Sequence, residues 1–196
     1  MKFESIGVYQ ACVVKIERHA DSRGFFARTF CEQEFAAAGL PSRMVQASIS
    51  FNAKRGTVRG MHFQWPPSCE GKLVRCLRGA VFDVLLDLRP ESPTYLRHVS
   101  VDLDEHGRDA VFVPHGVAHG FETLTDAAEV LYEMTDTYVP ELATGVRWDD
   151  PSFGIEWPIR HGIVISPRDA QYPDFDRLAF ESERQRRTTA GVCEHP

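Results

Sequence analysis

The sequence predicts an all-β protein, an antiparallel sandwich or barrel with short peripheral helices. Short segments rich in β-branched and aromatic residues recur along the chain, with turn residues between them. Only two stretches have a helical pattern. The 196 residues include 14 glycines and 12 prolines, which is enough for many turns and below the content of low-complexity sequence.

Ten strands are expected, and their β-branched and aromatic content is the main reason for each. Turns support the later ones: RG (78–79), RPESP (89–93), EHG (105–107) and PHG (114–116) separate neighbouring segments. The expected strands are 8–17, 24–30, 44–51, 56–63, 72–77, 80–88, 96–103, 109–113, 119–123 and 129–136.

The two expected helices cover residues 32–38 and 175–186. No internal repeat or linker divides the chain, so residues 1–180 are predicted to form a single domain. Residues 181–196 are polar and are predicted to form a frayed C-terminal tail.

Composition excludes several functional classes. The 22 basic and 28 acidic residues give a net charge of −6, which argues against general binding of nucleic acid or anionic membranes. The longest apolar run, 80–88, contains Asp83 and Asp87, and the first residues lack a signal-peptide pattern, so no membrane span is expected. Five cysteines without a C-x-x-C pair predict reduced thiols in a cytoplasmic protein.

Some predicted strands carry polar residues on an otherwise apolar face. Alternation places Lys72 with two apolar residues in 72–77, and Asp83 and Asp87 with apolar residues in 80–88. In 129–138, Tyr132 and Tyr138 share a face with an acid. These faces indicate either a polar patch inside a barrel or a sheet face that is open to water.

Two histidine segments, 59–64 (RGMHFQ) and 114–121 (PHGVAHGF), place histidines beside glycines at strand ends, where the backbone can approach a ligand. A lone histidine is more often structural, so neither segment defines a function by itself. In 59–64, Arg59 and His62 have opposite parity, and a bulge or twist at Gly60 would bring both to one face.

Seven segments together resemble the dTDP-4-dehydrorhamnose 3,5-epimerase family in order and spacing. They are 21–26 (DSRGFF), 59–64 (RGMHFQ), 71–75 (GKLVR), 81–84 (VFDV), 118–121 (AHGF), 148–151 (WDDP) and 166–169 (SPRD). The resemblance covers about residues 1–175. It implies a cupin-type jelly roll, usually a homodimer, that acts on a nucleotide-diphosphate 4-keto-6-deoxysugar without a metal or redox cofactor.

Epimerisation beside a ketone needs a base on one face of the sugar, a cation or donor at the developing enolate oxygen, and an acid on the other face. By resemblance, His62 is the base and Asp169 is the carboxylate that orients it. Lys72 is the group at the oxyanion and Tyr132 is the acid.

The resemblance also implies a set of substrate-binding residues. Arg59 would meet the pyrophosphate, Asp83 and His119 would lie near the sugar, and Tyr138 and Gln46 near the nucleotide. In this family the N-terminal strands can be exchanged between subunits, so Arg23, Phe26 and Arg28 would complete the partner's site.

Two positions depart from the family pattern near the nucleobase. Arg28 and Ser48 stand where the family usually has glutamate and asparagine. A guanidinium offers only donors, which suits the acceptors of cytosine or guanine better than the N3–H of thymine. The sequence therefore predicts CDP or GDP rather than dTDP, unless Arg28 faces solvent or phosphate and Gln46 and aromatic stacking hold thymine.

Two other functions compete with sugar-nucleotide epimerisation. A metal-dependent cupin oxygenase or isomerase would use residues 114–119, but Gln64 stands where that class has its second imidazole. A non-catalytic sugar-nucleotide-binding jelly roll would be expected to lose the base or the acid, and this chain retains His62, Asp169 and Tyr132.

Overall fold

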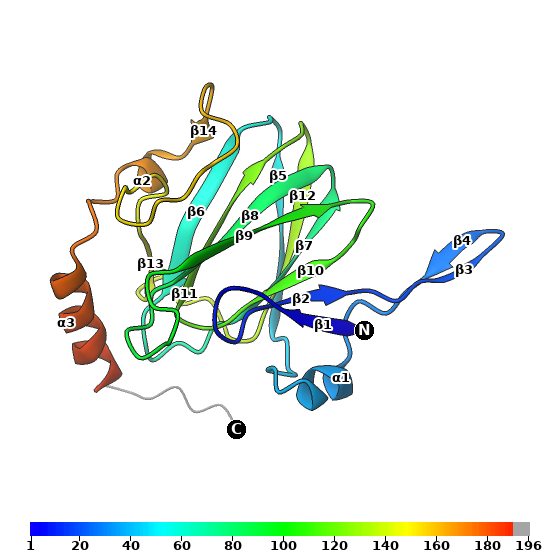
Figure 1. Cartoon of the computed structure of the whole chain (residues 1–196), viewed down its shortest axis with the longest axis horizontal. Coiled ribbons are helices and arrows are strands. Elements are labelled where there is room, and N and C mark those ends of the chain that lie inside the picture. The colour runs from blue at the N-terminus through cyan, green and yellow to red at the C-terminus, as the bar shows by residue number, and fades with distance from the viewer. Residues whose placement is uncertain (190–196) are drawn as a thin grey trace.

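Two mainly antiparallel sheets face each other in the computed structural model, which describes residues 1–189 (Figure 1). The first sheet has the order β1 (Lys2–Ser5), β2 (Cys12–Lys15), β10 (Ala110–Val113), β7 (Lys72–Arg78), β12 (Ala128–Met134) and β5 (Gln46–Asn52). The second has the order β13 (Ala143–Gly145), β6 (Thr57–Gln64), β11 (Val117–Thr123), β8 (Ala80–Asp87) and β9 (His98–Asp104), and β14 (Val164–Ile165) pairs with β6. The predicted all-β architecture is confirmed.

The N-terminal part differs most from the prediction. Residues 8–17 contain only the four-residue β2, and β1 precedes it unpredicted. The expected strand 24–30 is instead a short hairpin of β3 (His19–Asp21) and β4 (Gly24–Phe26). β13 and β14 have three and two residues, too few for an alternating pattern to be visible in the sequence.

Three helices lie at the periphery. α1 (Glu32–Ala37) and α3 (Arg177–Thr188) confirm the two expected helices, whereas the four-residue α2 (Pro167–Ala170) was not expected. The prediction of a frayed tail from residue 181 is wrong for residues 181–188. These residues are helical, and Arg184 among them is buried. Residues 190–196 of that predicted tail, which include Cys193, lie outside the described residues.

The inner face between the sheets is identified by one apolar cluster. It takes alternate residues from both sheets, including Val74, Cys76, Val81, Leu85, Val117, Phe121 and Val130. A second cluster packs α3 through Phe180 against the outer face of β6 and β8, and a third packs α1 through Phe35 against β2, β7 and β10. The polar residues that share the inner faces of these strands therefore lie inside the barrel.

The β3–β4 hairpin, which we call the arm, projects away from the barrel (Figure 1). Phe26, which pairs with His19 at the base of the arm, is 77% exposed, and Phe25 is also exposed. No strand of either main sheet pairs with β3 or β4 among the described residues. A two-stranded hairpin without further pairing is only marginally stable in water, so the arm needs support from elsewhere.

Cys12, Cys31 and Cys76 are free thiols, as the sequence predicts. Cys69 is disulfide-bonded, so the expectation of reduced thiols is wrong at that position. None of the helices in residues 1–189 is long and apolar enough to cross a membrane.

Strands β6 and β11 come unusually close at two glycines. The register shifts between His119 and Phe121. His62 pairs with His119 and Arg59 pairs with Phe121, so β6 has one more residue than β11 between the two pairs. A Cβ on Gly60 would lie 2.5 Å from the Cα of Gly120, and Gly60 has a φ of +136°. The predicted irregularity at Gly60 is confirmed, and it brings Arg59 and His62 to the same inner face.

We expect Gly60→Ala to lower the free energy of unfolding by about 3 kcal/mol, because the new methyl group meets backbone and alanine is strained at that φ. Urea unfolding followed by circular dichroism measures the change.

Gly154→Ala is the control, since Gly154 also has a positive φ of +65° but nothing lies within 4 Å of its added Cβ. It should cost only about 1 kcal/mol. Equal losses in the two variants would show that the close approach of β6 and β11 is not important for stability.

Candidate active site

His62 and Asp169, two of the predicted catalytic residues, form a close histidine–carboxylate pair. The Nε2 atom of His62, on β6, lies 2.7 Å from Oδ1 of Asp169, on α2. The side chain of Asp169 is 7% exposed and that of His62 is 40% exposed. The imidazole therefore has one nitrogen fixed by a buried carboxylate while its ring remains accessible from the barrel interior.

Local sequence explains why Asp169 reaches His62. Ser166 caps α2, with Oγ accepting from the backbone N–H of Asp169 at 3.1 Å, and Pro167 occupies the first turn. The Asp169 carboxylate is thereby free to bind His62 and, through Oδ2, the N–H of Gly60 at 3.4 Å. Burial alone would raise the pKa of Asp169, but its interactions with His62 and the Gly60 N–H lower it. Asp169 is held as a carboxylate.

A second histidine–carboxylate pair lies next to the first. His119 on β11 is the register partner of His62, and its Nε2 lies 2.9 Å from Oδ2 of Asp83 on β8. Both side chains are buried, and Oδ1 of Asp83 has no hydrogen-bond partner. These contacts confirm the inward face predicted for Asp83 and place an imidazole pair along one wall of the barrel.

Tyr132 reaches into the barrel from the opposite sheet. It lies on β12, packs against the inner apolar cluster, and its ring meets the ring of His119 edge to face at 5.9 Å between centroids. Burial, together with the negative charge of Asp83, raises the pKa of Tyr132 well above its usual value. The phenol therefore keeps its proton at neutral pH.

Lys72 lies on the same inner face of the first sheet. It begins β7, two residues before Val74, which is the register partner of Tyr132. The Nζ atom of Lys72 lies 3.2 Å from Oε2 of the largely buried Glu70. The ammonium group is thus held near Tyr132 by a carboxylate that the sequence analysis did not single out.

Arg59 has a partner that the sequence analysis missed. Its Nε donates to Oδ1 of Asn52 at 2.7 Å, and the amide of Asn52 in turn donates to the carbonyls of Ser50 and Ala128. Asn52 is 2% exposed whereas Arg59 is exposed. The buried amide of Asn52 therefore fixes Nε of Arg59 and leaves the terminal nitrogens of the guanidinium able to reach an anion.

The remaining barrel residues line one edge of the site. Ser48 on β5 is the register partner of Tyr132, so both side chains share the inner face. Gln46 accepts a hydrogen bond from the N–H of Tyr138 at 3.2 Å, and Tyr138 is 46% exposed. Arg168, a cation beside Asp169 that the sequence analysis did not single out, donates to the carbonyl of Ala143 at 3.2 Å.

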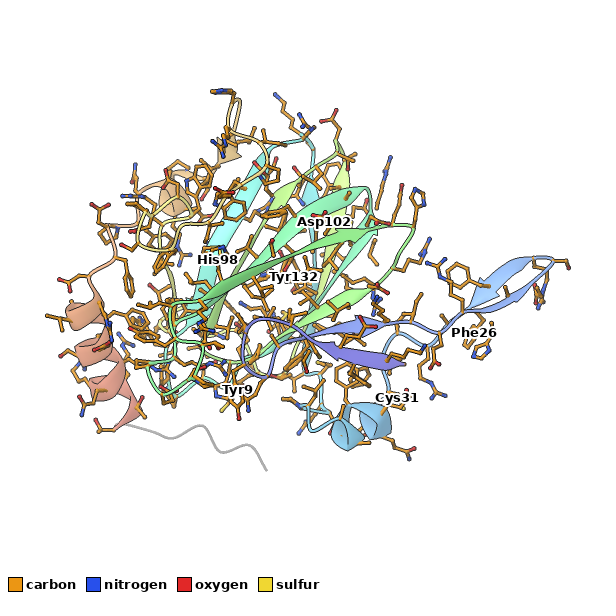
Figure 2. The ribbon with its side chains drawn as sticks, in the orientation of Figure 1. Tyr9, Phe26, Cys31, His98, Asp102 and Tyr132 are labelled. Atoms are coloured by element: carbon orange, nitrogen blue, oxygen red, sulfur yellow. The ribbon has the colours of Figure 1, made fainter. Side chains whose placement is uncertain are left out.

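Three predicted binding residues are not brought to this site within the chain. Figure 2 shows Phe26 on the arm, away from Tyr132 in the barrel. Arg23, also on the arm, pairs with Asp21 at 2.6 Å. Arg28 follows the arm and pairs with Glu34 of α1 at 2.6 Å. In a single chain the site consists of the barrel residues alone.

The side chain at position 64 does not join a metal-ligand set. Gln64 Oε1 accepts from the N–H of Val139 at 2.8 Å, and its amide donates to the carbonyl of Thr137. Within residues 1–189, no group of three or more histidine, cysteine, aspartate or glutamate side chains is arranged to hold a metal ion. The Gln64 amide fastens the end of β6 to the segment that follows β12.

Comparison with known proteins gives consistent results over most of the chain. A sequence profile of the dTDP-4-dehydrorhamnose 3,5-epimerase family matches residues 6–177. The dTDP-4-dehydrorhamnose 3,5-epimerase of Sinorhizobium fredii is 40% identical over 178 residues, which are 91% of each chain. The dTDP-4-dehydrorhamnose 3-epimerase of Streptomyces niveus is 40% identical over 86% of this chain and 81% of its own.

The fold is similar as well. The crystal structure of dTDP-4-dehydrorhamnose 3,5-epimerase from Bacillus anthracis, with TDP and PPi bound, has a TM-score of 0.85 at 32% identity, covering 89% of this chain and 99% of that chain. This similarity confirms the cupin-type jelly roll that the resemblance implied. His62, bound by Asp169 of α2, and Tyr132 enter this barrel from opposite sheets. The chain therefore belongs to the dTDP-4-dehydrorhamnose 3,5-epimerase family.

Proposed function

We propose that this protein epimerises C3, C5 or both centres of a nucleotide-diphosphate 4-keto-6-deoxysugar by removing and returning protons, as a 3,5-epimerase or a 3-epimerase. One observation carries the proposal: His62, fixed by Asp169, and the protonated Tyr132 enter the same barrel from opposite sheets. A ring bound between them has a base on one face and an acid on the other, as inversion requires.

His62 acts as the base. The 4-ketone makes the hydrogens on C3 and C5 acidic, and the neutral imidazole takes one of them as a proton. Because Asp169 is held as a carboxylate 2.7 Å from Nε2, it stabilises the imidazolium that forms and fixes the orientation of the ring.

Lys72 stabilises the enolate. Removal of the proton moves negative charge onto the ketone oxygen, and preorganised donors are most effective there. Lys72 supplies an ammonium group on the inner face of β7, and His119, whose Nε2 is occupied by Asp83, lines the site beside the sugar. The buried carboxylate keeps the second imidazole in a fixed orientation.

Tyr132 returns a proton to the opposite face of the sugar. Its raised pKa keeps the phenol protonated through neutral and mildly alkaline pH, so it is available as the acid. Abstraction by His62 followed by protonation from Tyr132 inverts the carbon, whereas return of the proton by His62 restores the original centre.

The nucleotide diphosphate extends from the sugar toward Arg59, Gln46, Ser48 and Tyr138. Arg59 faces the pyrophosphate with its Nε already held by Asn52. Tyr138 is exposed and can stack on a base. The arm of a second subunit covers this end of the site in a homodimer, since Phe26 of each chain lies away from its own barrel (Figure 2) and Arg23 lies in the turn between β3 and β4.

We also propose a cytoplasmic location and CDP or GDP as the carrier. The three free thiols support a cytoplasmic location, against which Cys69 stands as the exception. Arg28 and Ser48 favour CDP or GDP. Nη1 of Arg28 is paired with Glu34, and the other N–H groups of this exposed guanidinium can donate to an acceptor base.

His62→Asn should lower turnover by about 10²–10⁴-fold, because asparagine cannot accept the substrate proton. The measurement is deuterium incorporation at C3 and C5 of a 4-keto sugar nucleotide in deuterated water, read by NMR. His98→Asn, which changes a histidine on β9 outside this site, is the control. Near-normal incorporation in a folded His62→Asn protein would exclude His62 as the base.

Tyr132→Phe should slow completed epimerisation more than deuterium wash-in. His62 can still remove and return a proton on its own face, whereas the phenol needed on the other face is missing. The ratio of the two rates is the quantity to compare with wild type. Tyr138→Phe should leave that ratio unchanged, and an unchanged ratio in Tyr132→Phe would limit Tyr132 to positioning the sugar.

The nucleotide preference is tested by calorimetric titration with dTDP, CDP, GDP and UDP. If Arg28 and Ser48 contact the base, CDP or GDP should bind at least about tenfold more tightly than dTDP, since a mispaired polar group costs about 1–3 kcal/mol. Arg28→Glu should shift the preference toward dTDP. Tightest binding of dTDP by the wild-type protein would contradict the prediction.

A further inference from the structure

Arg75 is a buried cation that the proposed chemistry does not use. It lies on β7, facing away from the barrel interior, and is 4% exposed. Its guanidinium donates to two backbone carbonyls, that of Thr29 at 3.1 Å and that of Arg108. Burial lowers the pKa of Arg75, and the charges of Glu133 and Asp109 counteract this. Burying a guanidinium is costly, so its two carbonyl contacts are the feature to explain.

The two carbonyls belong to segments far apart in the sequence. Thr29 lies in the segment between β4 and α1, just after the arm, and Arg108 lies in the turn between β9 and β10. Arg75 therefore ties the exit of the arm to that turn. Because both acceptors are main-chain atoms, the contact fixes the path of the backbone rather than the position of a side chain.

The segment that leads into β3, on the other side of the arm, is bound to the same turn. Arg18, just before β3, donates to the carbonyl of Gly107 at 2.9 Å and to that of His106. The guanidinium carbons of Arg18 and Arg108 lie 4.7 and 5.8 Å from the centre of the Phe25 ring. Together these contacts form a clamp at the base of the arm, with Arg75 as its buried member.

We propose that Arg75 is a positioning residue for the active site of the partner subunit: by clamping the base of the arm, it sets where Phe26 and Arg23 meet the bound nucleotide. The inference rests on the proposed homodimer and its exchanged arms. Arg75 touches neither substrate nor the reacting atoms, and it acts through the backbone of residues 27–30.

The clamp should influence binding rather than chemistry. A hairpin that is not held at its base samples many orientations, and each binding event must then order it again. His62, Asp169 and Tyr132 are carried by the barrel and are unaffected by the arm's orientation. Loss of the clamp is therefore expected to raise KM while leaving kcat nearly constant.

Arg75→Met tests this expectation, because methionine fills similar space without donors. We expect KM to rise about tenfold with kcat changed by less than about twofold, and amide hydrogen exchange across residues 19–30 to accelerate. Arg75→Lys, which keeps one cationic donor group, should restore part of the loss. Arg78→Met removes an exposed guanidinium from the same strand and is the matched control.

A mixed dimer shows in which subunit the residue acts. An Arg75→Met subunit has an intact barrel and a loose arm, whereas a His62→Asn subunit has an intact arm and no base. In a purified heterodimer of the two, the only active barrel receives the intact arm. We expect wild-type KM with half the wild-type kcat per dimer.

Two results would overturn the proposal: an unchanged KM in the Arg75→Met homodimer, or a heterodimer with the raised KM of that homodimer. Arg18→Met tests the same clamp from its exposed side if Arg75→Met fails to fold, and it should raise KM in the same direction. Failure of the proposed function is distinct, because the wild-type protein would then incorporate no deuterium or sediment as a monomer.

Discussion

The close approach of β6 and β11 at Gly60 is the constraint on which the site depends. The extra residue in β6 turns both Arg59 and His62 toward the barrel interior, which regular alternation would prevent. The same glycine donates its N–H to Asp169 at 3.4 Å. One irregular position thus directs the side chains of His62 and Arg59 into the barrel and supplies a hydrogen bond to Asp169.

The polar interior is stable because its charged groups are paired. His62 has Asp169, His119 has Asp83, Lys72 has Glu70 and Arg59 has Asn52. Except for Lys72–Glu70, which are two residues apart, these pairs join different elements, so the pairing also fixes how the elements pack. Oδ1 of Asp83 is the exception, a buried acceptor without a partner that strengthens the negative potential around Tyr132.

Sequence reasoning located the barrel and its inward residues because alternation survives in long strands. Strands β7, β8 and β12 show it clearly, and parity grouped Asp83 with apolar residues of its strand and Tyr132 with Tyr138. Parity did not show whether those faces pointed into a barrel or toward water, because that depends on how the two sheets pack. Short elements were not predicted, because they contain too few residues for a periodic pattern to be visible. The four residues of α2 contain no periodicity, although Ser166 and Pro167 are a helix-start signal that could have explained how Asp169 is aimed. Asn52 and Glu70 were missed because their roles depend on contacts between strands.

The arm illustrates a different limit of sequence reasoning. Residues 24–30 have strand-forming composition, yet only Gly24–Phe26 pair, and they pair with β3 rather than with a main sheet. Nothing in the local pattern shows that a hairpin leaves the barrel. Its base is held by hydrogen bonds from Arg18 and Arg75 to backbone carbonyls, and these contacts join segments far apart in the sequence. His62 and Tyr132 are thus fixed by strand pairing within the barrel, whereas the arm is fixed by contacts made at its base. This difference explains why alternation reveals the barrel residues and no local pattern reveals the arm.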